Sequence, residues 1–206
     1  MLEPEPAAAA IVFGERIEQA RAFTKSLAEH GEERGLIGPL EPPRLWSRHI
    51  LNCAVLGALL RPGRVGDVGS GAGLPGLALA IVRPDVSLVL IEPMERRVVW
   101  LQEQADSLGL ENVQVVRARA EELRLDAPLD QVTARAVSAF KKLIPLTAPL
   151  VRDGGELVLM KGASAEREIE MAVKEARRYR LSDVRVEDVG VGVVDPATRV
   201  IRATVR

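Results

Sequence analysis

Four glycines fall within the ten-residue stretch DVGSGAGLPG, which runs from Asp67 to Gly76. Glycine has no Cβ, so such a loop can turn sharply and bring its backbone close to a ligand. Two patterns overlap here. The residues Gly71, Gly73 and Gly76 form G-x-G-x-x-G, which is typical of dinucleotide binding. The alternative, D-x-G-x-G-x-G, begins at Asp67 and continues through Gly69, and it suits S-adenosylmethionine. The two patterns predict different enzymes.

Three features of the sequence favour S-adenosylmethionine. An acid, Asp67, directly precedes the loop, Pro75 falls within the spacing of the dinucleotide pattern, and little chain remains for a second substrate domain. The predicted second strand, SLVLIE, ends in Glu92, and an acid at that edge can accept hydrogen bonds from both ribose hydroxyls. After the third strand, ARAEEL places Ala120 and Glu121 beside the base, unless these residues only begin a helix. These positions indicate a nucleoside ligand.

Composition bounds the chemistry. The chain has 206 residues and 47% hydrophobic content, enough for one well-buried domain with a modest extension. A single cysteine, Cys53, and two histidines allow no internal disulfide and no credible metal site. No segment approaches the roughly 20 apolar residues that cross a bilayer, and no secretion signal is evident, so we expect a cytoplasmic protein without a membrane contact.

The net charge of −1 gives no global sign of nucleic-acid binding, but the charges are unevenly distributed. Residues 42–66 contain four arginines and no acid, and residues 131–152 contain two arginines and two lysines and no acid. We expect these two segments to form one positive rim around the glycine loop.

The order of predicted elements gives the fold. Residues 1–10 are rich in alanine and are predicted to be disordered, residues 11–60 to form a helical extension, and residues 61–206 to form the main domain. Within that domain short apolar runs alternate with helical patterns, which is typical of βαβ units and a parallel sheet. The last two runs, DVRVEDVGV and TRVIRATVR, leave no room for a helix and should pair antiparallel. The expected class is α/β, a mostly parallel seven-stranded sheet with a C-terminal antiparallel hairpin.

Four motifs together carry a family resemblance: LWSRHILNC, DVGSGAGLPG, RAEEL and TARA. With them the chain resembles the RsmG (GidB) family of bacterial 16S rRNA guanine-N7 methyltransferases, from about Phe13 to the C-terminus. The resemblance implies a Rossmann-like class I methyltransferase fold. It implies methyl transfer from S-adenosylmethionine to N7 of a guanine in the decoding-region loop, with 16S rRNA or the small ribosomal subunit as partner, no metal, and a monomer. Asn52 and Cys53 stand where an Asp and a Ser are common.

The candidate cofactor-binding residues come from two sources. The resemblance implies contacts at Gly69, Leu74, Ala120, Glu121 and Arg135. The physical argument adds Asp67, Gly71, Gly73 and Glu92.

The attacked atom sets what the protein must supply. Guanine N7 carries an in-plane lone pair and no proton, so the transfer needs no general base, and alignment of the reactants is the main requirement. Arg135 and Lys161 end two adjacent strands and are predicted to position the substrate. The predicted RNA-binding residues are Arg44, Arg48, His49, Lys141 and Lys142. For His49 a packed or capping role is the alternative.

Two other types of protein stay open from the sequence. One is a methyltransferase that acts on a small molecule or a protein, and the other is an NAD-linked oxidoreductase. Trp46 and Trp100 could stack on a base, but their apolar neighbours at helical spacing favour the core.

Overall fold

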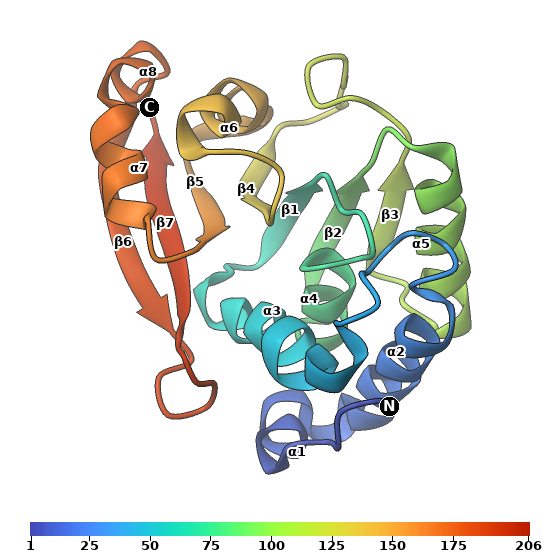
Figure 1. The fold of residues 1–206 in the computed structure, drawn as a ribbon. Coiled ribbons are helices and arrows are strands. Elements are labelled where there is room, and N and C mark those ends of the chain that lie inside the picture. The colour runs from blue at the N-terminus through green and yellow to red at the C-terminus, as the bar shows by residue number, and fades with distance from the viewer.

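The computed structural model describes residues 1–206 and is built on one seven-stranded sheet with strand order β3-β2-β1-β4-β5-β7-β6 (Figure 1). The pairs among β1 to β5 are parallel, whereas β7 runs antiparallel to both β5 and β6. The predicted fold class is therefore confirmed. The strands are β1 Gly63–Val68, β2 Val86–Ile91, β3 Val113–Val116, β4 Leu129–Ala134, β5 Val151–Lys161, β6 Leu181–Val189 and β7 Thr198–Val205.

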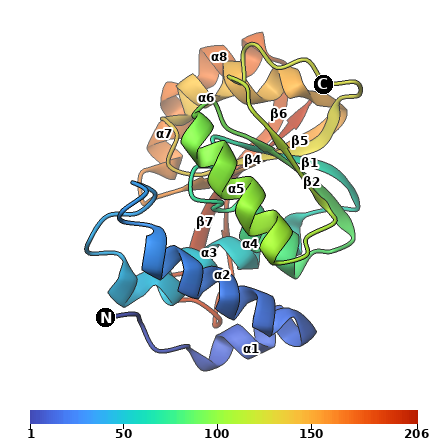
Figure 2. The same cartoon turned by 90° about the vertical axis from the view of Figure 1, so that its right-hand side faces the viewer.

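Helices cover both faces of the sheet (Figure 2). One face carries α4 (Gly76–Val82) and α5 (Glu95–Ser107) together with the N-terminal helices. The other carries α6 (Phe140–Thr147), α7 (Ala165–Met171) and α8 (Val173–Arg178). Each face has its own apolar cluster. Strands that are covered on both sides need apolar residues on both sides, which explains continuous runs such as SLVLI.

The order of the strands in the sheet changes direction between β1 and β4. Strands β2 and β3 lie on one side of β1, and β4 and β5 lie on the other. In open α/β sheets a ligand binds at the carboxyl ends of the strands, at this switch point. The glycine loop follows β1 and Arg135 follows β4, so the two lie on either side of it.

The N-terminal extension packs on the sheet. It contains α1 (Ala7–Phe13), a single turn η1 (Gly14–Arg16) and α2 (Ile17–His30). The predicted disorder of residues 1–10 is wrong, because α1 begins at Ala7 and Ala9 is fully buried. Alanine is the best helix former, and its small side chain allows close packing. The segment before α1 is fixed by polar contacts: the Glu3 amide donates to the Pro42 carbonyl at 2.9 Å, and Arg21 pairs with Glu5 at 2.6 Å.

A second helical segment, within the predicted extension of residues 11–60, leads into β1, but it is irregular. It runs through η2 (Pro42–Arg44), a π-helix η3 (Trp46–Leu51), α3 (Asn52–Ala54) and η4 (Val55–Leu59). π-helical turns are rare and often occur at functional sites. This one contains the WSRHIL part of the sequence motif.

Two helical segments on the other face are divided. α6 is followed directly by η5 (Ala148–Leu150), where Pro149 lies, and the helical segment after β5 breaks between α7 and α8. Residues 117–128, between β3 and β4, contain no helix and no strand. No helix of the chain has the length and apolar character needed to cross a membrane.

The apolar cluster on the α4 face includes residues from α1, α2 and the π-helix as well as from β1 and β2. Replacing Phe23, which is fully buried in α2, with alanine should therefore destabilise the whole chain by about 3 to 5 kcal/mol. Urea unfolding should still show one transition, at a lower midpoint. Lys25→Ala, on the exposed side of the same helix, is the control. Two separate transitions would show that the extension folds independently.

Candidate active site

The loop after β1 is held from inside the protein by Asp67. One carboxylate oxygen, Oδ2, accepts a hydrogen bond from the Gly76 amide at 2.9 Å, and Ser70 Oγ donates to the Asp67 carbonyl at 2.9 Å. Further along the loop, Trp100 Nε1 donates to the Ala72 carbonyl at 3.0 Å. The middle of the loop and its end at Gly76 are thus fixed to buried side chains. Trp100 is itself 1% exposed, so it supports the loop from the core and is not free to stack on a base.

Asp67 is fully buried, and burial raises the pKa of its carboxyl to about 7, against the opposing hydrogen bond from the Gly76 amide. Its second oxygen, Oδ1, has no hydrogen-bond partner. A buried polar atom without a partner is unfavourable and is uncommon in folded proteins. Asp67 therefore offers an unused acceptor directly below the loop.

Glu92 lies at the end of β2, at the carboxyl edge of the sheet where the sequence predicts it. Its side chain is buried, with Oε2 accepting from the Gly71 amide at 2.9 Å and Oε1 accepting from the Met94 amide at 3.0 Å. The carboxylate therefore links the glycine loop to the neighbouring strand. Its binding of ribose hydroxyls stays a prediction.

The glycines of the loop differ in what surrounds them. All three of Gly69, Gly71 and Gly73 have positive φ, which side chains rarely adopt. A Cβ on Gly73 would lie 2.4 Å from the Leu77 side chain, and one on Gly69 would lie 2.7 Å from Val137. At Gly71 the nearest atom is the Gly69 carbonyl oxygen at 3.7 Å. Only Gly71 therefore presents bare backbone to open space.

The residues predicted beside the base follow β3. Ala120 and Glu121 lie in a turn and not at the start of a helix; Glu121 is exposed and Ala120 is half-buried. Both line a hollow of about 470 Å³ between residues 120–128 and the end of α6. Leu74, in the glycine loop, is buried.

Arg135 occupies the centre of the site at the end of β4. Its guanidinium donates to Cys53 Sγ at 3.0 Å and also hydrogen-bonds His49 Nδ1. The opposite ring nitrogen of His49, Nε2, lies 2.5 Å from Glu41 Oε2. Burial lowers the pKa of His49, as does the nearby positive charge of Arg135, while Glu41 opposes the shift. His49 is thus a buried neutral imidazole and not an exposed contact for RNA.

A groove of about 1170 Å³ opens beside Arg135, between the N-terminal helical segment, the loop after β4 and the C-terminal hairpin. Its cationic lining residues are Arg44, Arg48, Arg135, Lys161 and Arg199. Arg48 is exposed and has no carboxylate partner, whereas Arg44 pairs with Glu41 at 2.7 Å and Arg199 pairs with Asp188 at 3.1 Å. The lining also contains the acids Glu168, Asp188 and Asp195. The cations outnumber these acids, and Arg48 and Arg135 have no carboxylate partner.

Lys161 lies at the end of β5 and lines the groove as predicted, but it is not free. Its ammonium pairs with Glu168 at 2.8 Å and donates to the Ser138 carbonyl at 2.7 Å, and its side chain is only 7% exposed. The same Glu168 accepts from the Phe140 amide at 2.6 Å. Lys161 therefore fixes the loop between β4 and α6, in which Ser138 follows Arg135 by three residues.

The single positive rim predicted from the two basic segments is only partly present. Arg44, Arg48 and Arg135 meet in the groove. Arg64 and Arg152 instead lie at the opposite end of the strands, where the Arg64 guanidinium pairs with Asp126 and that of Arg152 pairs with Asp130. Arg61 pairs there with Glu156. Residues that begin a strand and residues that end one lie at opposite edges of a parallel sheet, which a count of local charge cannot resolve.

Lys141 and Lys142 are exposed on the first turn of α6 and do not line the groove. Lys141 lies 3.7 Å from Glu175 of α8. They follow the groove residue Ala139 by two and three residues in sequence, so they stay predicted contacts for a longer RNA.

Two departures from the family motif have local explanations. Cys53 is buried and its sulfur accepts from Arg135, so it supplies an acceptor where a serine is common. Thr198 Oγ1 lies 3.1 Å from the Asn52 side-chain oxygen, so the amide connects the π-helical segment to β7. Trp46 is 3% exposed and belongs to the core.

Sequence reasoning missed Glu41 and Arg199. Glu41 lies in a proline-rich connection with no periodicity to mark it, and its role depends on His49, which is eight residues away. Arg199 belongs to the alternating strand TRVIRATVR, whose polar positions do not reveal that one of them borders a groove.

The comparisons with known proteins agree with this geometry. A family model described as rRNA small subunit methyltransferase G matches residues 16–193. The chain belongs to this family. Proteins named ribosomal RNA small subunit methyltransferase G from Leifsonia xyli and Clavibacter michiganensis are 69% and 66% identical to it, each covering 100% of this chain, which covers 98% and 97% of theirs.

Solved structures of more distant proteins share the fold. A SAM-dependent methyltransferase from Aquifex aeolicus aligns with a TM-score of 0.57 at 21% identity, covering 80% of this chain and 94% of its own. TYW2 from M. jannaschii, in complex with AdoMet, aligns with a TM-score of 0.59 at 20% identity, covering 78% and 76%. At this identity the likeness supports the Rossmann-like methyltransferase fold.

Gly71 offers a clean test of the ligand site. In Gly71→Val the new side chain would extend into open space, so binding of S-adenosylmethionine, measured by calorimetry, should fall at least about tenfold, with about 1 to 3 kcal/mol lost from strain at positive φ. Gly73→Val should also disturb α4, since its side chain would overlap Leu77. Normal donor binding by a folded Gly71→Val protein would place the ligand elsewhere.

Proposed function

We propose that this protein transfers a methyl group from S-adenosylmethionine to N7 of a guanine in the decoding-region loop of 16S rRNA. The observation that carries the proposal is that the glycine loop lies against the loop after β4, with Gly69 beside Val137, and that Val137 and Arg135 also line the cationic groove. The chain belongs to the rRNA small subunit methyltransferase G family. The loop suits a nucleoside donor, and the groove suits a polyanion.

The residues of the loop fit the methyl donor. Gly71 has room above its backbone, and Asp67 Oδ1 is a buried acceptor without a partner. Glu92 ends the second strand, where an acid can accept from ribose hydroxyls. Ala120 and Glu121, after the third strand, are the proposed contacts of the base. Leu74 and Gly69 complete the proposed set in the loop.

When bound, S-adenosylmethionine supplies an electrophilic methyl group on a sulfonium. Guanine N7 already holds the lone pair that accepts it, so no side chain needs to remove a proton. The contribution of this chain is to hold the base with N7 in line with the methyl, and alignment of this kind can supply several kcal/mol, roughly 7 to 11 in the best intramolecular models.

Arg135 is the proposed substrate-positioning residue. A guanidinium can donate to guanine O6, which lies beside N7, and it thereby orients the base. It must leave N7 itself free. Lys161 acts indirectly in this proposal, by holding the Ser138 carbonyl and so the loop that carries Arg135. Both residues thereby help to hold the base in position for the transfer.

The remaining cationic side chains are the proposed contacts of the RNA phosphates. Arg48 is the strongest candidate because its charge is exposed and unpaired, and Arg44 and Arg199 border the same groove. Lys141 and Lys142 would contact RNA beyond the groove. We propose a monomeric cytoplasmic enzyme that needs no metal.

The decisive measurement is the N7-methylguanosine content of 16S rRNA from cells with and without this protein, mapped by cleavage at modified guanines. We expect one guanine in the decoding-region loop to lose its methyl group when the protein is absent and to regain it on complementation. Purified protein with labelled donor should modify the same guanine. Methylation of a small molecule or protein, with the rRNA unchanged, would instead support the alternative substrate class.

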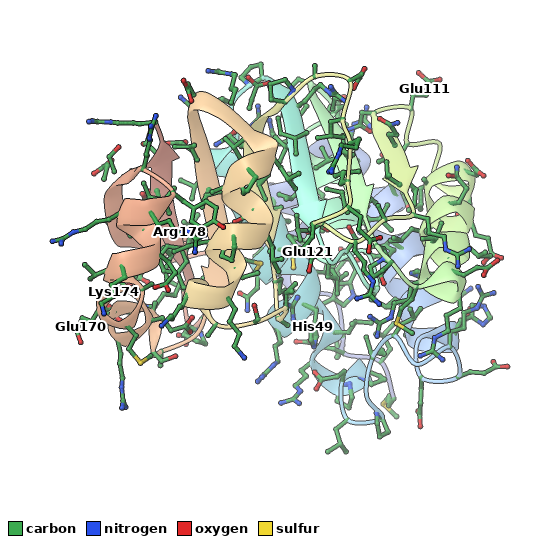
Figure 3. All side chains as sticks on the ribbon, turned by 90° about the horizontal axis from the view of Figure 1, so that it is seen from above. His49, Glu111, Glu121, Glu170, Lys174 and Arg178 are labelled. Atoms are coloured by element: carbon green, nitrogen blue, oxygen red, sulfur yellow. The ribbon has the colours of Figure 1, made fainter.

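Arg48→Gln should weaken rRNA binding by about threefold to tenfold and reduce the slope of log affinity against log salt by about 0.7 to 1, because one phosphate contact is lost. Lys174→Gln is the matched control. Lys174 is also exposed and unpaired, and it lies on the outer side of α8, away from His49 (Figure 3). Equal slopes for both variants would remove Arg48 from the RNA interface.

A further inference from the structure

Arg135 directly follows the last residue of β4. Its guanidinium is nevertheless held by residues more than 80 positions earlier in the sequence. His49 Nδ1 and Cys53 Sγ are its hydrogen-bond partners, and both come from the helical segment that precedes β1. An arginine has several rotatable bonds, so its direction depends on such partners. The extension therefore sets where this guanidinium points.

The hydrogen bonds define the protonation state of His49. A guanidinium has donors only, so His49 Nδ1 must accept from Arg135. The proton of the neutral ring is then on Nε2, which donates to Glu41 Oε2 at 2.5 Å. Glu41 is an acceptor in turn, and the bond from His49 holds the pKa of its carboxyl at about 2. Every donor in the chain from Arg135 to Glu41 has an acceptor.

We propose that His49 and Glu41 are positioning residues that orient Arg135 for methyl transfer. This rests on the proposed function, because it assigns the role of Arg135 to that reaction. Glu41 fixes the tautomer and direction of the imidazole, and the imidazole fixes one nitrogen of the guanidinium while Cys53 fixes another. The arginine can then present its remaining donors to the ligand side. His49 contributes from beneath the groove and needs no contact with RNA.

The chain of hydrogen bonds from Arg135 through His49 to Glu41 also reaches the rim of the groove. Glu41 pairs with Arg44, through Oε1 at 2.7 Å and Oε2 at 3.0 Å, and Arg44 lines the groove. A phosphate that draws Arg44 away would leave Glu41 with His49 as its main partner. Since the two contacts share one carboxylate, RNA binding at the rim and the orientation of Arg135 are coupled through Glu41.

Protonation of His49 would interrupt the arrangement, because both ring nitrogens would then be donors and Nδ1 could not accept from Arg135. The charged groups that face the ring are Glu41, Arg135 and Arg48, and the two arginines and burial favour the neutral form. The ring is therefore neutral at pH 7. It becomes charged only as the pH falls below the ordinary histidine pKa of 6.5, so the loss of activity belongs to the acid side.

Two amide variants separate the two contacts of His49. The side-chain oxygen of asparagine can occupy the place of Nδ1 and accept from Arg135, whereas the nitrogen of glutamine can occupy the place of Nε2 and donate to Glu41. If the bond to Arg135 matters, His49→Gln should lower kcat/KM for rRNA methylation at least about tenfold, and His49→Asn should retain activity within about threefold. Glu41→Gln should give an intermediate loss. Thermal unfolding of each variant reports its stability.

The pH profile distinguishes positioning from a structural role. Below pH 6.5 the activity of wild type should fall more steeply than that of His49→Asn, which has no titrating ring. Asp67 also titrates in this range, but it is present in both proteins and cancels in the comparison. The control is His30→Asn, which changes the other histidine of the chain, exposed at the end of α2, and should leave the profile unchanged.

Three outcomes are distinguishable. A wild type that methylates no rRNA guanine would overturn the proposed function itself. An active wild type with equal kcat/KM in His49→Gln and His49→Asn, or with the acid limb unchanged in His49→Asn, would overturn the role of His49. Equal losses that follow only the loss of thermal stability would also count against it. Rescue by asparagine, together with the shifted acid limb, would support it.

Discussion

Two buried carboxylates at adjacent strand ends organise the site. Asp67 lies near the end of β1, before the glycine loop, and Glu92 lies at the end of β2. The Asp67 carboxylate accepts a hydrogen bond from the Gly76 amide, and the Glu92 carboxylate accepts one from the Gly71 amide. A buried carboxylate needs such donors, since its desolvation is otherwise costly. The loop in turn gains two fixed points that its glycines cannot provide themselves. The glycines allow the sharp turns of the loop, and the two carboxylates hold the loop in the single conformation that binding requires.

The other half of the site is fixed in a different way. Arg135 lies at the end of β4 and is held through His49 by the N-terminal segment, and the loop after it is held through Lys161 from β5. The cation is therefore fixed from two directions that are remote in sequence. The shared apolar cluster of α1, α2 and the sheet keeps these parts together. The extension is in this sense part of the site.

Much of this arrangement could be predicted from the sequence, and the limits are physical. Strands β1 and β2, the glycine loop and Glu92 follow from local patterns, because periodicity and glycine content are properties of neighbouring residues. The bond between Arg135 and His49 joins residues 86 positions apart, and no local pattern encodes it. Lys161 looked free because its partner Glu168 lies in the next helix and reaches back. The ordered N-terminus was missed because alanine-rich composition does not reveal a partner surface for Ala9.

The π-helix from Trp46 to Leu51 has a consequence for how this family can vary in length. In a π-helix the hydrogen bonds span five residues, so one more residue fits into the turn than in an α-helix. Removing a single residue here would return the segment to an α-helix and rotate everything beyond it by roughly 100°. In the present structure Arg48 lines the groove and the adjacent His49 is buried. After such a deletion the two side chains could not keep both positions. Insertions and deletions can accumulate in the connections around it, but in this turn the number of residues is itself part of the active-site geometry.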